Sequence, residues 1–356
     1  MSDPTAPTPL VVGILYPPEW YGDVERFGAA VADLEDLGGV EVVVQTYVEP
    51  HDLRSARGKP GADRLHEQAP PLTDAQRSAL ARLDVALAID LPFDVGRVAP
   101  RLRWVQAVGA GTGQLQSAGL AEAGIRLTTA AGANAVAIAE FALARVLQEW
   151  KRFRALDELQ ARHDWEPLYG RQLEGSTLGL LGLGAINSAV ASRAAAFGLR
   201  VLATRRSATP GSRAANVEQV FPPSELHRML GQCDAVVAAV PETPETTGLM
   251  DGAAFAAMKP GSFFCNVGRG SLLDEAALIA ALERGHLRAA ALDVAHVEPL
   301  PPDDPLWSAP NLLLSPHSAS APTALFVNLH RLFRDNLARF LAGEPLLNQV
   351  DLGRGY

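Results

Sequence analysis

The feature that most constrains the fold is a regular alternation of short apolar runs with longer segments of helical period. A first series of runs occupies residues 10–15, 42–44, 85–89 and 104–108, and a second series begins after Gly175. The runs of the second series are residues 178–183, 201–203, 235–240, 263–267, 289–292 and 312–314. Buried parallel strands joined by crossover helices produce this rhythm. The sequence therefore predicts an α/β protein with two doubly wound parallel sheets.

The division into domains follows from the segment between the two series. Residues 134–154 keep a helical period and contain neither Gly nor Pro, so that one helix can bridge two bodies. A last amphipathic stretch, residues 324–341, follows the second series and is expected to pack back onto the first body. We therefore expect a discontinuous domain over residues 1–133 and 319–356, and a second domain over residues 134–318.

One long connection interrupts the first series. Residues 51–76 are rich in Pro, Gly, Arg and Asp and show no clear period. This composition is typical of surface loops. We expect a long connection with one helical turn.

Composition and charge disfavour several classes of protein. The net charge of -9 opposes a nucleic-acid partner, because phosphate backbones are bound by clustered cations. The first ten residues lack the apolar run of a signal peptide, and no stretch approaches the roughly 18 apolar residues of a membrane span. We expect a cytoplasmic protein without membrane contact. Cys233 and Cys265 lie in or beside apolar runs, which predicts buried thiols rather than a disulfide framework or a metal site.

A glycine turn opens the second series. Residues 178–181 form an apolar strand, and an Ala-rich helix follows the glycines directly. This order suits a pyrophosphate, which approaches the open N–H groups at a helix N-terminus. Asn187 stands where the dinucleotide-binding fingerprint has its third glycine, so we expect slightly altered helix packing. The expected cofactor contacts at this turn are Gly182, Gly184, Ala185 and Ile186.

The residues after the next strand bear on the choice of cofactor. About 20 residues past the turn, a dinucleotide site presents the side chain that meets the adenosine ribose. An acidic residue there would bond a free 2′-hydroxyl, whereas guanidinium groups and hydroxyls suit a 2′-phosphate. The residues at this place are Thr204, Arg205, Arg206 and Ser207. We therefore expect NADP(H) in preference to NAD(H); a pair of solvated arginines is the alternative interpretation.

Several segments, taken in chain order, carry a resemblance to a known family. They are Trp104-Val105-Gln106, Val108-Gly109-Ala110-Gly111, residues 134–140, the glycine turn, residues 240–246, Asn266-Val267-Gly268-Arg269-Gly270, Leu292-Asp293-Val294 with Glu298-Pro299, and Ser315-Pro316-His317. Together they resemble the D-isomer-specific 2-hydroxyacid dehydrogenases, from about residue 102 to the C-terminus. The resemblance implies a Rossmann-type cofactor domain and a flavodoxin-like, discontinuous substrate domain.

The family's catalytic set is an arginine, a glutamate and a histidine, which correspond here to Arg269, Glu298 and His317. The histidine is expected to exchange a proton with the substrate oxygen, and the glutamate to favour its imidazolium form. The arginine is expected to hold the substrate carboxylate with its planar fork. The resemblance implies hydride transfer between a nicotinamide cofactor and a small 2-keto acid or D-2-hydroxy acid, as in glyoxylate/hydroxypyruvate reductases.

Further contacts are implied by the same resemblance. On the cofactor side they are Val240, Pro241, Thr246, Val267, Gly268 and Asp293. Asp293 would touch the nicotinamide carboxamide, or it would serve backbone amides instead. The substrate would contact Val108, Gly109, Ala110, Gly111, Arg269 and His317. Family members are usually homodimers joined through the cofactor domain, and Trp165 lies in the connection that reaches toward the partner.

Three alternative functions stay open at this point. Formate dehydrogenases share the arginine and the histidine but have glutamine where Glu298 stands, which argues against that activity. A phosphite-oxidising relative would share the acidic residue. A cofactor-sensing interaction protein, similar to the C-terminal-binding co-repressors, would keep the same residues without depending on turnover. The identity of the 2-keto acid does not follow from the sequence.

Overall fold

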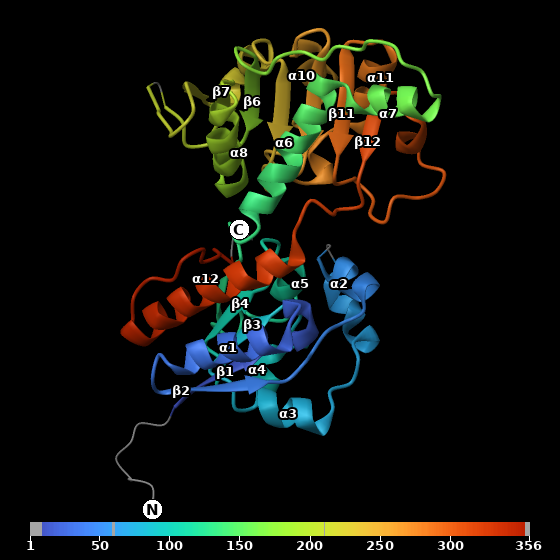
Figure 1. Ribbon diagram of the computed structural model, residues 1–356. Coiled ribbons are helices and arrows are strands. Elements are labelled where there is room, and N and C mark those ends of the chain that lie inside the picture. The colour runs from blue at the N-terminus through green and yellow to red at the C-terminus, as the bar shows by residue number, and fades with distance from the viewer. Residues whose placement is uncertain (1–8, 59–60, 210, 353–356) are drawn as a thin grey trace, which may run out of the picture. The chain divides into compact units, whose positions relative to one another are not determined.

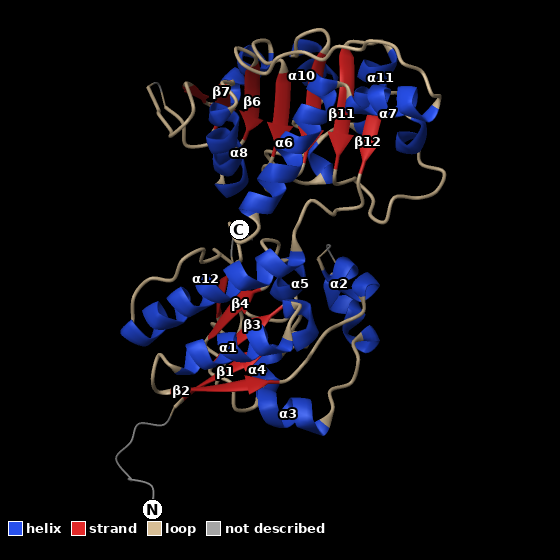
Figure 2. Ribbon diagram, in the orientation of Figure 1, coloured by secondary structure: helices blue, strands red, loops and turns tan. Residues whose placement is uncertain are grey.

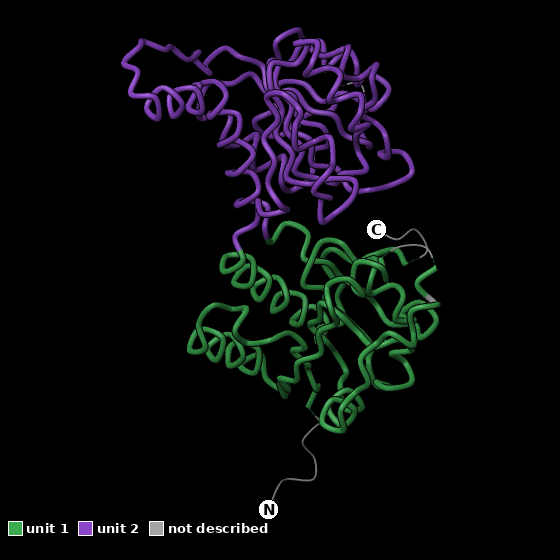
Figure 3. Tube along the Cα trace, turned by 90° about the vertical axis from the view of Figure 1, so that its right-hand side faces the viewer, with its two compact units in different colours: residues 1–133, 322–356 green, residues 134–321 purple. Residues whose placement is uncertain are grey.

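The computed structural model describes residues 9–58, 61–209 and 211–352. The chain divides into two compact units (Figure 3). Unit 1 consists of residues 1–133 and 322–356, and unit 2 of residues 134–321. The chain therefore leaves unit 1 once and returns to it for its last helix.

Unit 1 is built on a five-stranded parallel sheet with the strand order β2-β1-β3-β4-β5 (Figure 1). This is the strand order of flavodoxin-like sheets. The strands are β1 (Leu10–Ile14), β2 (Val40–Val44), β3 (Val85–Ala88), β4 (Trp104–Ala107) and β5 (Arg126–Thr128). The helices are α1 (Val24–Glu35), α2 (His51–Arg57), α3 (Asp74–Leu80), α4 (Val95–Val98), α5 (Gly113–Gln116) and α12 (Pro322–Ala342), with 3-10 helices at Pro18–Tyr21 and Ala62–Gln68.

Both faces of this sheet are covered. Val12 and Ile14 of β1 are buried in one cluster with side chains of α1 and α12. Val11, between them along the strand, belongs to a second cluster with Leu80 of α3 and Leu115 of α5. Alternate side chains of a strand point to opposite faces, so that a continuous apolar run requires helices on both sides.

The prediction of a loop over residues 51–76 is wrong. The segment holds α2, a 3-10 helix at Ala62–Gln68 and the start of α3, while residues 59 and 60 lie outside the described part. Arg57 of α2 is 1% exposed and forms an ion pair with buried Glu49. A capping box between Thr73 and Gln76 begins α3. Tertiary ion pairing and capping thus stabilise helices that have little hydrophobic period.

Unit 2 is built on a seven-stranded parallel sheet with the order β12-β11-β10-β9-β6-β7-β8 (Figure 2). The strands are β6 (Thr177–Leu181), β7 (Arg200–Thr204), β8 (Gln219–Phe221), β9 (Ala235–Ala238), β10 (Ser262–Asn266), β11 (Leu287–Leu292) and β12 (Leu312–Leu314). The helices are α6 (Ala135–Lys151), α7 (Phe153–Ala161), α8 (Ala185–Ala196), α9 (Leu226–Leu230), α10 (Gly252–Ala257) and α11 (Glu275–Glu283), with 3-10 helices at Pro223–Glu225, Gly270–Leu272 and Pro305–Ser308. The order is that of a Rossmann sheet, in which the chain reverses direction beside its first strand.

Helices cover both faces of the second sheet as well. One apolar cluster joins α6 and α8 to inward side chains such as Leu180 and Phe263. The other joins α9, α10 and α11 to the opposite side chains, such as Val236 and Phe264. The prediction of an α/β protein with two doubly wound parallel sheets is confirmed. The prediction of buried cysteines is confirmed too, since Cys233 and Cys265 are free, buried thiols.

Two further searches concern the described residues alone. None of their helices has both the length and the apolar character needed to cross a membrane. No group of three or more His, Cys, Asp or Glu side chains among them is arranged to hold a metal ion.

Candidate active site

The expected site residues of unit 2 follow the ends of its parallel strands. The glycine turn follows β6, residues 205–207 follow β7, and residues 240–246 follow β9. Arg269 follows β10, Glu298 follows β11 and His317 follows β12. Parallel strands place their carboxyl ends at one edge, where ligands of open α/β sheets bind. These segments therefore share one edge of the sheet.

His317 and Glu298 are in direct contact. Nδ1 of His317 lies 2.8 Å from Oε2 of Glu298, and the other carboxylate oxygen accepts the N–H of Ala295 at 3.0 Å. Among the residues that the structure describes, none bonds Nε2 of His317, and the side chain is half exposed. The imidazole is thus held through one nitrogen and presents the other to its surroundings.

The contact shifts the pKa of both groups. The hydrogen bond with Glu298 raises the pKa of His317 above its ordinary value, against the opposing effect of burial. Burial acts to raise the pKa of Glu298, but the bonds from His317 and from the Ala295 amide, with the charge of Arg269, lower it overall. The pair therefore favours an imidazolium beside a carboxylate. A histidine in this state can donate a proton near neutral pH.

Arg269 lies on a loop that is packed tightly against the loop of Glu298. A Cβ atom on Gly270 would lie 2.0 Å from the carbonyl of Ala295, so that only glycine allows this approach. Asn266 fixes the same loop, since its Nδ2 donates to the carbonyl of Arg269 at 2.9 Å and its Oδ1 accepts the N–H of Gly268 at 3.0 Å. The guanidinium charge is close enough to affect the pKa of both His317 and Glu298. The structure thus brings the three expected catalytic residues together.

Asp293 holds the loop that carries His317. Its Oδ1 accepts the Ser315 hydroxyl at 2.5 Å and the N–H of Ser318 at 3.0 Å, and its Oδ2 accepts the N–H of Ala319 at 3.0 Å. Its carbonyl accepts the N–H of His317 at 2.8 Å. His317 itself has a left-handed φ of 51°, which few non-glycine residues adopt. Two roles were considered for Asp293, contact with the nicotinamide or acceptance of backbone N–H groups. The observed hydrogen bonds correspond to the second role.

The glycine turn has the shape that a pyrophosphate requires. Gly182 has a φ of 80°, and a Cβ atom there would lie 2.4 Å from Val240 Cγ1. Nothing lies within 4 Å of the corresponding position at Gly184, the N-cap residue of α8. Among the residues that the structure describes, no side chain caps this helix, so its first N–H groups are open to an anion.

Asn187 takes the place of the third glycine by forming hydrogen bonds. It is fully buried, and its Nδ2 donates to the carbonyls of Leu181 at 2.9 Å and Gly182 at 2.7 Å. The side-chain amide therefore ties the first turn of α8 to the end of β6. Its Oδ1 has no hydrogen-bond partner among the described residues.

The four residues expected at the adenosine ribose divide into two kinds. Thr204 is 4% exposed, and its hydroxyl accepts the N–H of Gly182 at 2.9 Å. It therefore stabilises the glycine turn. Arg205, Arg206 and Ser207 are exposed. The charge of Arg206 contributes to a lowered pKa at Glu245, whose main cause is a hydrogen bond with Thr243.

The remaining expected cofactor contacts line the same edge. Thr246 closes the turn after β9, because its hydroxyl donates to the carbonyl of Pro241 at 2.7 Å. A Cβ atom on Gly268 would lie 3.0 Å from the carbonyl oxygen of Val240, so these two loops are in contact. Val267 is buried beneath them.

The expected carboxylate-binding turn belongs to unit 1. Val108 is buried at the end of β4 and donates its N–H to the carbonyl of Ala88 at 3.0 Å. Within the described part of the chain, the N–H groups of Gly109, Ala110 and Gly111 have no acceptor. Open N–H groups in a glycine turn can bind an anion.

Comparison with known proteins bears on these observations. Residues 143–319 match the family described as D-isomer specific 2-hydroxyacid dehydrogenase, NAD binding domain. Glyoxylate reductase of Aeropyrum pernix is 34% identical over 264 residues, which cover 71% of this chain and 77% of that protein. The chain belongs to the D-isomer specific 2-hydroxyacid dehydrogenase family.

Other members differ in length. D-3-phosphoglycerate dehydrogenase of Mycobacterium bovis is 33% identical over 290 residues, which are 80% of this chain but 54% of that protein. The chain thus spans about half the length of the D-3-phosphoglycerate dehydrogenases that it matches. The D-isomer specific 2-hydroxyacid dehydrogenase of Xanthobacter autotrophicus Py2, solved in complex with NADPH and MES, is 29% identical with a TM-score of 0.74. That comparison covers 98% of this chain and 100% of the solved one.

Some residues that shape this candidate site were not singled out from the sequence. Ser315 and Asn266 stand inside segments that carry the family resemblance, but their hydrogen bonds to Asp293 and Arg269 depend on the folded loops. Glu275 of α11 accepts the N–H of His296 at 2.8 Å and so supports the loop of Glu298. Nothing in its sequence context distinguishes it from a solvated helix residue.

Proposed function

We propose that the chain is an NAD(P)-dependent D-2-hydroxyacid dehydrogenase that reduces a small 2-keto acid. The contact between His317 and Glu298 supports this most, because it supplies a proton donor at the edge of the sheet that holds the glycine turn. A keto reduction needs one proton for the carbonyl oxygen. Family membership supports the same reaction class.

The cofactor would bind along the loops of unit 2. Gly184 and the first N–H groups of α8 would hold the pyrophosphate, and Arg205 with Arg206 would meet a 2′-phosphate. The complex of the Xanthobacter relative with NADPH supports NADP(H) as the preferred form. When bound, the reduced nicotinamide supplies a hydride. The predicted cytoplasmic location is part of this proposal.

The side chains of this chain would divide the rest of the work. Arg269 orients the substrate by a bidentate contact with its carboxylate and polarises the carbonyl. His317 donates the proton on Nε2 to the substrate's carbonyl oxygen, which gains negative charge during the reduction. Glu298 keeps the ring oriented and charged until that transfer. In the oxidation of the hydroxy acid, the neutral imidazole accepts the proton instead.

The substrate class follows from the groups that would bind it. A 2-keto acid carries a carboxylate, and two features each suit such a group: Arg269 in unit 2 and, in unit 1, the open N–H groups of Gly109, Ala110 and Gly111. The relative from Aeropyrum pernix is named a glyoxylate reductase. We therefore propose glyoxylate and other small 2-keto acids, such as hydroxypyruvate, as the first candidates.

A spectrophotometric screen tests the proposal. Oxidation of NADPH and NADH is followed at 340 nm with glyoxylate, hydroxypyruvate and bulkier 2-keto acids. Reduction of the oxidised cofactors is followed at the same wavelength with formate or phosphite as the substrate. Turnover on a 2-keto acid with a preference for NADPH supports the proposed reaction, substrate class and cofactor. Absence of turnover on all of them, with cofactor binding intact, would favour the cofactor-sensing interaction protein.

A homodimer through unit 2 completes the proposal. The segment after α7 exposes large apolar side chains, with Trp165 100% and Tyr169 83% exposed, and Phe153 of α7 is 50% exposed. Exposed apolar groups in one segment are typical of contact surfaces. Sedimentation of the wild type and of W165E/Y169E tests this, since we expect a dimer for the former and a monomer for the latter.

A further inference from the structure

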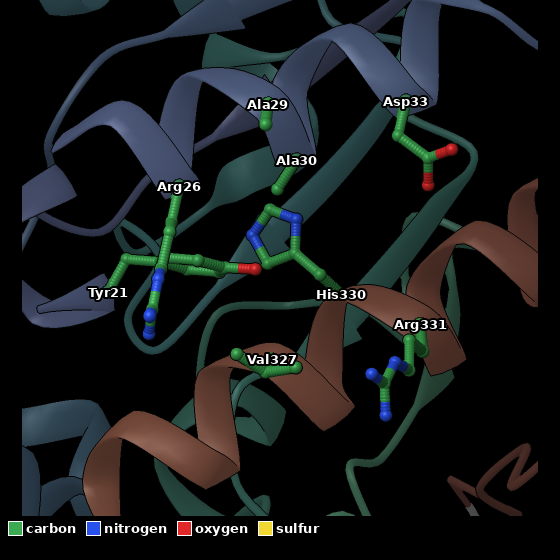
Figure 4. A pocket seen from close by; sticks show the side chains of 8 residues that line it. All are labelled: Tyr21, Arg26, Ala29, Ala30, Asp33, Val327, His330 and Arg331. Atoms are coloured by element: carbon green, nitrogen blue, oxygen red, sulfur yellow. The ribbon is translucent and has the colours of Figure 1, made fainter. Parts of the chain in front are cut away.

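A pocket in unit 1 lies beside α1, α12 and the 3-10 helix at Pro18–Tyr21 (Figure 4). Its volume is about 290 Å³, close to the lower end of the range of small-molecule sites. Ala29, Ala30 and Val327 form its apolar part. None of the residues that line it belongs to the proposed catalytic or cofactor-binding set.

Two arginines bring positive charge to this pocket. Arg26 comes from α1 and Arg331 from α12, and Figure 4 shows Arg26 at the Tyr21 ring and Arg331 past His330 on α12. Neither forms an ion pair with a residue that the structure describes. The one acidic side chain in the lining, Asp33, is already paired with Arg334 at 2.8 Å. The pocket therefore has two exposed arginines without an ion-pair partner among the described residues, of which Arg331 donates to Oδ1 of Asn328 at 3.5 Å.

Tyr21 adds a hydroxyl that is open to the pocket, although the rest of the residue is buried. The residue is 6% exposed, and its ring packs edge-on against Phe27 and His330. Within the described residues its hydroxyl forms no hydrogen bond, and Figure 4 shows it pointing across the pocket toward His330. Burial raises the pKa of Tyr21, while the charges of Arg331 and Arg26 lower it. The hydroxyl is thus a donor without an acceptor among the described residues, and the charges of both arginines reach it.

His330, toward which this hydroxyl points, is in its neutral state. It is 5% exposed, its Nε2 is bonded to the hydroxyl of buried Tyr16, and its Nδ1 has no partner among the described residues. Burial lowers the pKa of His330 to about 4. If Tyr16 donates to Nε2, the neutral ring carries its proton on Nδ1 and offers a second unused donor. Buried donors without acceptors are uncommon in folded proteins.

We propose that this pocket binds a small molecule that carries an oxyanion of the phosphate class, with Arg26, Arg331 and the Tyr21 hydroxyl as its ligands. Guanidinium groups bind phosphate oxygens through charge-assisted, often bidentate hydrogen bonds. A cation is disfavoured by the two arginines. The apolar part formed by Ala29, Ala30 and Val327 leaves room for a short carbon skeleton beside the anion.

Calorimetric titration of the full chain with inorganic phosphate, at constant ionic strength set by chloride, tests the proposal. We expect binding that R26Q and R331Q each weaken about tenfold, as for the loss of one charge-assisted hydrogen bond. Y21F keeps the ring contacts and removes only the hydroxyl, so it should weaken binding by a smaller factor. R77Q changes an exposed arginine of α3 and should bind phosphate like the wild type.

Phosphate could also occupy the cofactor loops, and a second variant separates the two sites. R205Q/R206Q should keep the binding that R26Q/R331Q loses. The proposal is overturned if phosphate binding follows Arg205 and Arg206 instead, or if no heat is detected up to about 10 mM phosphate, beyond the millimolar range of weak specific sites. Thermal unfolding of each variant shows whether it is folded.

Discussion

The Nδ1 atom of His317 lies 2.8 Å from Oε2 of Glu298, and the contact joins a loop after β12 to a loop after β11. It raises the pKa of the histidine, chiefly through the hydrogen bond itself, and lowers that of the glutamate. The charged pair therefore persists both above the ordinary pKa of histidine and below that of glutamate. This contact sets the expected pH dependence of the reaction.

Keto-acid reduction requires the imidazolium form of His317. We expect kcat/KM for reduction to stay level through neutral pH and to fall as the pH rises through the raised pKa of this histidine. E298Q removes the carboxylate charge, so this fall should move to lower pH while the protein stays folded. A pH profile of NADPH oxidation for both proteins measures the shift. An identical pH profile in E298Q would show that Glu298 does not set the pKa of the proton donor.

The same pair stabilises the fold, and this contribution is lost in part at each end of the pH range. The raised pKa of His317 stabilises the fold below the unfolded value of 6.5, and this contribution is lost as the pH rises through the folded value. The lowered pKa of Glu298 stabilises the fold above 4.5, and this contribution is lost as the pH falls through the folded value. Both groups are partly exposed, so solvent screening keeps these effects small.

H317A should lower kcat by about 10² to 10⁴, the usual contribution of a general acid. The affinity for NADPH should stay close to that of the wild type, because no expected cofactor contact is removed. Fluorescence titration with NADPH and steady-state kinetics separate the two effects. H286A is a suitable control, since His286 bonds the carbonyls of Phe255 and Met258 away from the site residues. Wild-type turnover in H317A would remove this residue from the mechanism.

R269K should damage the binding and orientation of the keto acid, because a point charge cannot replace a bidentate fork. We expect a higher KM together with a lower kcat, while the Kd for NADPH changes little. Arg269 donates to the carbonyl of Gly268 at 2.8 Å, so thermal unfolding should accompany the kinetics. An unchanged KM and kcat would contradict the proposed role.

The strands of both sheets could be predicted because most are continuous apolar runs. The exceptions are β5 and β8, because each of these three-residue strands contains polar residues, whereas the equally short β12 consists of three leucines. The helices within residues 51–76 were missed because Arg57 and Glu49 stabilise them from inside the protein, and a charged residue gives no sign of burial in a sequence. The residues of the proposed catalytic set could be named from their motifs. The support from Ser315 and Asp293 could not, because those bonds join loops that are distant along the chain.

Asn187 offers a test of how one turn compensates for a missing glycine. N187A removes the donor to the carbonyls of Leu181 and Gly182, which stay buried. We expect a loss of about 1–3 kcal/mol in the free energy of unfolding, the cost of unsatisfied buried groups, together with weaker NADPH binding. N187G restores the fingerprint residue and should recover cofactor affinity better than N187A. Equal stability of the wild type and N187A in urea would show that the amide bonds contribute nothing.

The buried ion pair of Arg57 and Glu49 gives the last prediction. Nη1 of Arg57 donates to Oε1 of Glu49. Nε of Arg57 donates to the Ser117 hydroxyl at 2.9 Å, and the Arg57 guanidinium lies 3.8 Å from the centroid of the Phe93 ring. Glu49 Oε2 and Arg57 Nη2 have no further partner among the described residues. Removing one partner leaves the other charge buried, which usually costs about 3–5 kcal/mol. R57M should therefore unfold at much lower urea, whereas R77M on the exposed face of α3 should not.

The pH dependence of R57M distinguishes a stranded charge from a simple packing defect. Burial already raises the pKa of Glu49, and Arg57 is the main group that lowers it. Without Arg57 the folded state binds a proton more tightly than the unfolded chain, so the free energy of unfolding should rise as the pH falls toward 5. Adding E49Q should remove this pH dependence and recover part of the lost stability. If R57M is equally unstable at every pH and E49Q changes nothing, the cost of the substitution comes from packing against Phe93 and not from the unpaired carboxylate.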